Sequence, residues 1–99
     1  MPKVITVHGT EYLIKYPVGA LIRAEMHLGK PISRLDTQAM TYLEMSILTR
    51  YGLHNLDEKP ISEDEFDRLL EEISPIEFAT VFTDVVSEIS PPDEEPGKN

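Results

Sequence analysis

Residues 12–29, YLIKYPVGALIRAEMHLG, decide the fold, because they contain the end of a strand, a proline break and a complete short helix. Pro17 ends the strand, and its fixed φ angle suits the entry to a helix. We predict this helix over residues 18–28, since Gly29 favours a left-handed stop and Pro31 blocks continuation. The helix carries a broad apolar stripe made of Val18, Leu21, Ile22, Met26 and Leu28, with Ala24 beside it.

A β-hairpin is predicted before this helix, with strands over residues 3–7 and 10–16 and His8-Gly9 as the turn. In that register Val7 lies opposite Thr10, Ile5 opposite Tyr12, and Lys3 opposite Ile14. Side chains alternate between the two faces of a strand, which gives the hairpin an apolar face for the core. A lone hairpin is marginal in water, so it must pack on helices or on another chain. The core face holds Ile5, Val7, Tyr12, Ile14 and Tyr16.

Three more helices are predicted, at about 37–51, 63–73 and 75–89. Asp36 or Thr37 is expected to cap the first of them, and Gly52 to stop it, before a polar loop at residues 53–60. The other two each begin with a Ser-x-x-Glu capping box inside a pair of hydrophobic staple residues. These boxes are Ser62 with Glu65, flanked by Ile61 and Phe66, and Ser74 with Glu77, flanked by Ile73 and Phe78.

The sequence therefore predicts an α+β fold that is mostly α-helical, with an N-terminal β-hairpin packed on about four short helices. Residues 1–89 are expected to form one domain. Residues 90–99, SPPDEEPGKN, contain three prolines and three acidic residues. Because this stretch cannot bury an apolar face, it is predicted to be a disordered acidic tail.

The net charge of −9 is spread unevenly along the chain. Residues 1–56 carry six Lys or Arg and four Asp or Glu, whereas residues 57–99 carry three and fourteen, a net charge of −11. This half would be repelled by phosphates, so direct binding to nucleic acid is not expected. No apolar run reaches membrane-spanning length, and the N-terminus lacks a signal-peptide core, which indicates a cytoplasmic protein.

Motifs for catalysis, cofactors or metals are not recognised in the sequence. The histidines, His8, His27 and His54, share no helical spacing, and there is no cysteine. The acidic run at residues 63–67 lacks the pattern of a calcium loop, and acidic residues are expected in the first turn of a helix. We therefore expect a protein without enzymatic activity, cofactor or metal.

Aromatic and methionine side chains are the candidates for binding a partner. Tyr12, Tyr16, Tyr42 and Tyr51 are amphipathic, and methionines adapt to irregular surfaces. Core packing is the alternative for each of them. The methionines at helical spacing are Met26, Met40 and Met45.

Residues 8–35, HGTEYLIKYPVGALIRAEMHLGKPISRL, carry a resemblance to a known family, above all in Gly19-Ala20 and in Glu25 four residues before Gly29. They resemble the small tail-assembly chaperones of long-tailed bacteriophages, prophages and gene transfer agents. The resemblance implies a non-catalytic protein of the bacterial cytoplasm that binds the long, helical tape-measure protein and tail-tube subunits. The residues expected to make these contacts are Tyr12, Tyr16, Leu21, Ile22 and Met26.

Two other functions fit the sequence. The carboxylates of residues 57–99 could mimic DNA and inhibit a DNA-binding protein, provided that they line one rigid face. A structural head–tail adaptor, which would form ordered rings, is the other alternative. Exposed hairpin edges also suggest a homo-oligomer.

Overall fold

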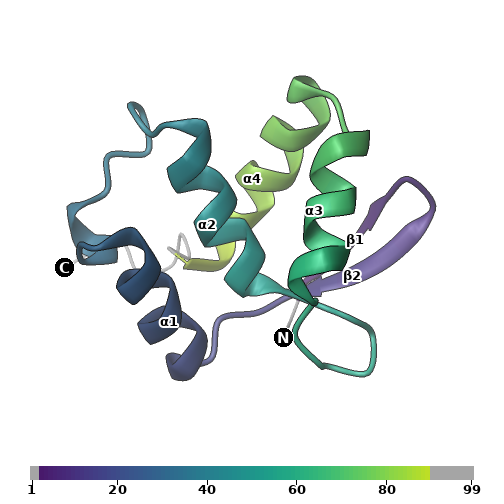
Figure 1. Cartoon of the computed structure of the whole chain (residues 1–99), viewed down its shortest axis with the longest axis horizontal. Helices are drawn as coiled ribbons and strands as arrows, with labels where there is room; N and C mark the ends of the chain where they lie inside the picture. The colour runs from purple at the N-terminus through teal and green to yellow at the C-terminus, as the bar shows by residue number, and fades with distance from the viewer. Residues whose placement is uncertain (1–2, 90–99) are drawn as a thin grey trace, which may run out of the picture.

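The computed structural model describes residues 3–89, and it has the α+β architecture that the sequence predicts (Figure 1). Strands β1 (Lys3–Val7) and β2 (Thr10–Ile14) form the hairpin, and a two-residue strand, β3 (Leu53–His54), extends it to an antiparallel sheet in the order β1-β2-β3. The helices are α1 (Val18–Leu28), α2 (Tyr42–Gly52), α3 (Glu63–Glu72) and α4 (Pro75–Ile89), with a short 3₁₀ turn, η1 (Ile32–Arg34). The predicted tail at 90–99 lies outside the described residues.

The hairpin has the predicted register, in which Val7 lies opposite Thr10 and Ile5 opposite Tyr12. Both turn residues have positive φ, 50° at His8 and 81° at Gly9, as a two-residue turn of the primed type requires. The predicted core face is buried at all four positions within the strands. Helix α4 contacts both strands of the hairpin, and α2 contacts α4 and α1. The hairpin and the helices therefore share one hydrophobic core.

Helix α2 begins later than predicted, because Thr41 is its N-cap rather than Asp36 or Thr37. The Thr41 hydroxyl accepts a hydrogen bond from the Glu44 backbone N–H, and the Glu44 carboxylate accepts one from the Thr41 N–H, both at 3.1 Å. Asp36 instead accepts a bond from the Gln38 N–H at 2.9 Å. An aspartate side chain can either cap a helix or close a local turn of this kind, and Asp36 closes the turn.

The predicted glycine stop and polar loop after α2 are also corrected. Gly52 is the last residue of the helix and does not have a left-handed conformation, since the chain passes directly into β3. Leu53 is completely buried and His54 nearly so. Pairing of Leu13 with His54 and of Ile14 with Leu53 places these residues in the sheet. A strand of two residues is too short to show an alternating pattern.

The capping signals of α3 and α4 locate both helices correctly. Ser74 and Glu77 form the full capping box, with hydrogen bonds of 2.8 and 3.2 Å. At α3 one half is present, because the Glu65 N–H donates to the Ser62 hydroxyl at 3.1 Å. The Glu65 carboxylate instead faces the hydroxyl of Tyr12, at 3.4 Å. Helix α3 ends at Glu72, one residue before the predicted end.

Candidate partner-binding surfaces

Tyr12 lies in the core and is only 4% exposed, so it is not a surface contact in this fold. Alternation along β2 points its ring toward the helices. Its hydroxyl reaches Glu65 at the start of α3. Burial, and then the negative charge of Glu65, raises the pKa of this hydroxyl. The structure thus places Tyr12 in the core, which was the alternative to a partner contact.

Tyr16 also has a structural role, because it joins the end of the hairpin to α2. Its ring lies against Gly52, where a Cβ atom would overlap it. Its hydroxyl donates a hydrogen bond of 2.7 Å to the Leu48 carbonyl. Burial raises the pKa of the Tyr16 hydroxyl well above its ordinary value. Like Tyr12, Tyr16 packs against the core, where it is partly buried.

Helix α1 buries its small side chains and exposes its large ones. Ala20 and Ala24, 1% and 0% exposed, are its buried residues, and the helix packs chiefly on α2. Leu21 and Leu28 are half-buried at the edge of this contact. The residues at a spacing of four on the opposite side form an exposed row, which we call the α1 stripe: Val18 (70% exposed), Ile22 (52%) and Met26 (76%). Two of the five predicted contact residues, Ile22 and Met26, are therefore presented to solvent together.

The charges beside the α1 stripe differ between its two flanks. The Arg23 guanidinium lies over Gly19, and no carboxylate in residues 3–89 forms a salt bridge with it. On the other flank, Glu25 accepts a hydrogen bond of 2.9 Å from the Ile32 N–H. Lys30, just after the helix, pairs with Glu44 at 2.7 Å. Within residues 3–89, Arg23 is thus a positive charge without a salt-bridge partner next to apolar surface.

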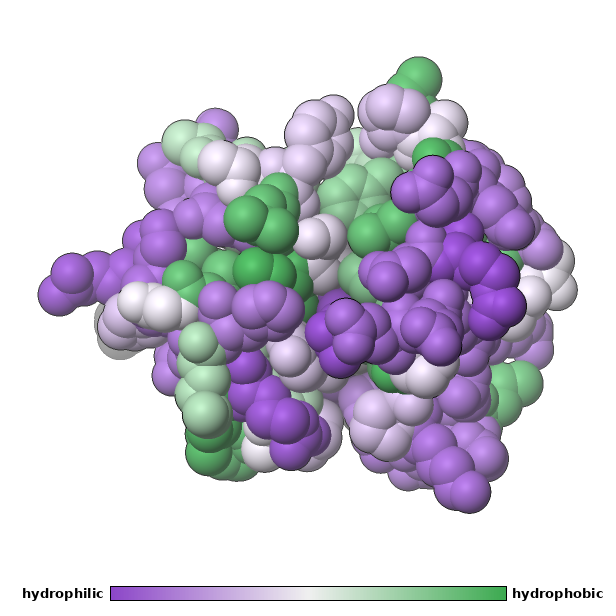
Figure 2. Space-filling model, viewed as in Figure 1, coloured by the Kyte–Doolittle hydropathy of each residue, from purple (hydrophilic) through white to green (hydrophobic). Residues whose placement is uncertain are grey.

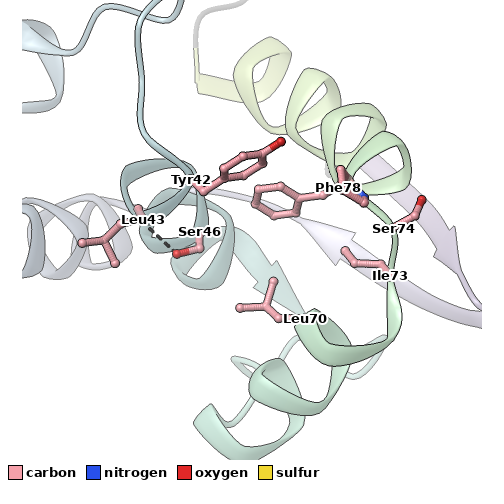
Figure 3. Close-up of a pocket in the computed structure, with 8 residues that line it drawn as sticks. Tyr42, Leu43, Ser46, Leu70, Ile73, Ser74 and Phe78 are labelled. Carbon is pink, nitrogen blue, oxygen red and sulfur yellow. Dashed lines mark hydrogen bonds between the residues drawn. The ribbon is translucent and has the colours of Figure 1, made fainter.

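A second apolar surface is a groove of about 360 Å³ between the start of α2, the end of α3 and the start of α4. Figure 3 shows the rings of Tyr42 and Phe78 side by side, with Leu70 and Ile73 below them and Leu43 pointing away. The two ring centroids are 6.2 Å apart, and Tyr42 is 64% exposed. We call this the α2–α4 groove; it is lined by Tyr42, Leu43, Ser46, Leu70, Ile73, Ser74, Pro75 and Phe78.

Acidic side chains border the α3 wall of the groove. At 100° per residue, Asp67 lies about 60° and Glu71 about 100° around the helix from Leu70. Both are exposed, and neither forms a salt bridge within residues 3–89. On α2, one turn after Ser46, the Arg50 guanidinium lies over the ring of Tyr51. Figure 2 shows apolar surface in the hollow and polar surface over α3.

A smaller hollow of about 210 Å³ lies where η1 meets the end of α4. Met40 lines it and is half-buried, as is Met45 of α2, so both of these methionines pack against the core. The other lining residues are Ile32, Ser33, Leu35, Thr37, Leu48, Val86 and Ile89. Of the three methionines predicted for a partner groove, Met26 alone is strongly exposed.

The histidines occupy three separate places. His8 lies at the hairpin turn, with its Nε2 atom 3.0 Å from the Glu77 carboxylate. The pKa of Glu77 is lowered first by the hydrogen bond from the Ser74 backbone and then by the hydrogen bond with His8. His27 contacts the Tyr51 hydroxyl, and His54 is buried with Nδ1 3.0 Å from the Gly52 carbonyl. Within residues 3–89, no three His, Cys, Asp or Glu side chains are grouped as metal ligands.

No helix between residues 3 and 89 is long and apolar enough to cross a membrane.

The groove is the feature that sequence reasoning missed. Phe78 and Ile73 were predicted as staple residues and Tyr42 as a candidate contact, so the surface that they share appears only in three dimensions. Comparison of this chain with family models, with curated proteins and with solved structures finds no match.

Proposed function

We propose that this protein is a non-catalytic tail-assembly chaperone that holds an amphipathic helix of a tape-measure protein in the α2–α4 groove. The observation that carries the proposal is an open groove of about 360 Å³ with an apolar lining and an exposed tyrosine at its edge. Amphipathic helices bind such grooves through apolar residues spaced three and four apart. The resemblance of residues 8–35 to tail-assembly chaperones supplies the class of partner.

The charge of the chain supports a chaperone. A protein that covers a partner's apolar stripe must expose apolar surface and still remain in solution. The net charge of −9 gives the chain colloidal stability, and much of it lies on α3, next to the groove. Binding of tail-tube subunits, and action in the cytoplasm of a bacterial host, belong to this proposal through the same resemblance.

Co-expression with the products of the neighbouring genes, among which the proposal expects a tape-measure protein and a tail-tube protein, tests the proposal. We expect the tape-measure protein to stay soluble and to be captured with this chain, even in about 1 M salt, where the Debye length is about 3 Å. The variant Tyr42→Ser should lose the capture. Ile76→Ser is the matched control, since Ile76 is 79% exposed and lies about 160° around α4 from Phe78.

Two results would overturn the proposal. Capture that is unchanged in Tyr42→Ser would place the partner elsewhere on the surface. Capture of a DNA-binding enzyme alone, lost as salt rises, would instead favour a DNA mimic that uses the exposed carboxylates of α3.

A further inference from the structure

We propose that the α2–α4 groove of one copy of this protein receives helix α1 of a second copy, which joins the copies head to tail. The α1 stripe would lie against Tyr42, Leu70 and Phe78, with Arg23 facing the acidic flank of α3. This inference concerns the purified chain alone. It does not depend on a tape-measure protein as the partner; a tape-measure helix in the same groove would compete with α1 of the second copy.

The first argument is the shape of the exposed apolar surface. A groove between helices accepts a row of apolar side chains on one face of another helix. Among residues 3–89, the other large exposed apolar side chains outside the groove are separate from one another: Val4 lies on β1, Leu56 in the loop after β3, and Ile76 on α4. The α1 stripe is a row of three at a spacing of four, about 12 Å long from Val18 to Met26.

The second argument is the charge on each side of the two surfaces. Asp67 and Glu71 border the α3 wall of the groove, and Arg23 borders the stripe, all without a salt-bridge partner in the described residues. A helix whose positive flank faces α3 therefore brings Arg23 toward these two carboxylates. This pairing of opposite charges on one side of the groove favours one orientation of the bound helix.

The third argument is that a chain cannot fill its own groove with its own stripe. Ala20 and Ala24 hold α1 on its own core, so the stripe points away from it. A contact between two different surfaces is heterologous, and each added copy leaves one stripe and one groove free. Such contacts continue into a closed ring or an open chain.

Sedimentation of the full chain over a range of concentrations tests the assembly. The weight-average mass should rise from the monomer's 11.2 kDa beyond that of a dimer. The stripe variant, Ile22→Ser with Met26→Ser, and the groove variant, Tyr42→Ser, should each weaken association more than about tenfold. All three side chains are more than half exposed, so folding should persist, which circular dichroism verifies. Ile76→Ser is the control that should associate as the original chain does.

Mixing the two variants is the decisive experiment. The stripe variant keeps its groove and the groove variant keeps its stripe, so together they have one intact contact. We expect a heterodimer of one copy of each that grows no further, measured by fluorescence anisotropy of one labelled variant. A mixture that associates no better than its components would overturn the proposal. So would a wild-type chain that stays monomeric, or a groove variant that associates normally.

A charge variant tests the orientation. Arg23→Glu should weaken association about fivefold at low salt, and adding Glu71→Arg to it should restore the affinity. Failure of this rescue would overturn the assignment of Arg23 to the α3 flank. The stripe variant also separates the two proposals, since it should lose self-association and still capture a tape-measure protein. A stripe variant that still self-associates would refute the assembly, and a stripe variant that also loses the tape-measure protein would refute the groove as the site that binds this protein.

Discussion

Replacement of Gly52 by alanine tests the packing that joins the sheet to α2. The new Cβ would overlap the ring of Tyr16, which cannot move aside without breaking its 2.7 Å hydrogen bond to the Leu48 carbonyl. Overpacking costs about 1–3 kcal/mol, and the broken hydrogen bond about 1 kcal/mol. The better helix propensity of alanine returns about 1 kcal/mol. We therefore expect Gly52→Ala to lower the free energy of unfolding by about 1–3 kcal/mol.

Urea denaturation followed by circular dichroism measures this change as a lower midpoint at an unchanged slope. Gly19→Ala is the matched control, because its Cβ would meet only the mobile end of the Arg23 side chain, at 3.3 Å. That variant should be as stable as the original chain or up to about 1 kcal/mol more stable. If Gly52→Ala were also neutral or stabilising, the packing of Tyr16 on Gly52 would be refuted.

Three further predictions concern the caps, the core and the alkaline limit of stability. Thr41→Ala should lower the free energy of unfolding in urea by about 1 kcal/mol, whereas Thr37→Ala should change it by less than about 0.5 kcal/mol; equal effects would contradict the cap at Thr41. Ala24→Leu should destabilise by about 1–3 kcal/mol, and a neutral result would mean that α1 does not pack through this residue. Because the pKa of Tyr16 is raised by folding, the unfolded chain releases this proton first as pH rises above about 10, so stability should fall by up to about 1.4 kcal/mol per pH unit. Urea titrations from about pH 9 to 11 should show a smaller decline in Tyr16→Phe, and an unchanged decline would refute the assignment.

The elements that the sequence predicted well are those with a local physical signal. The hairpin register follows from a two-residue turn, because that turn fixes which residues pair. The starts of α3 and α4 follow from capping boxes that satisfy backbone donors within four residues of sequence. Neither signal depends on what packs against the element.

The errors around α2 have two different causes. Asp36, Thr37 and Thr41 are all capable of capping a helix, and Glu44, three residues after Thr41, is the signal that distinguishes them. That signal is visible in the sequence. Strand β3 is different, since two residues are too few to show an alternation of apolar and polar side chains. Its position depends on long-range pairing with β2.

The exposure of the predicted contact residues could be predicted only in part, because hydropathy does not say which face of a helix is covered. Tyr12 and Tyr16 are amphipathic and could face either way, and tertiary hydrogen bonds to Glu65 and Leu48 place them inside. Ile22 and Met26 were expected at a contact and are exposed. The groove could not be predicted, since it is formed by three helices whose relative positions no local pattern specifies.

The packing of α1 explains why this small chain leaves large aliphatic groups in water. Burial of a valine, isoleucine or methionine stabilises a fold by about 1.5–3 kcal/mol, so a face with Val18, Ile22 and Met26 would ordinarily be turned inward. Helix α1 instead turns Ala20 and Ala24 toward its own core. The fold therefore omits several kcal/mol of burial within the monomer, and the same apolar surface remains available to stabilise a contact with another chain. The association that we propose would account for this orientation of α1, which intramolecular stability alone does not.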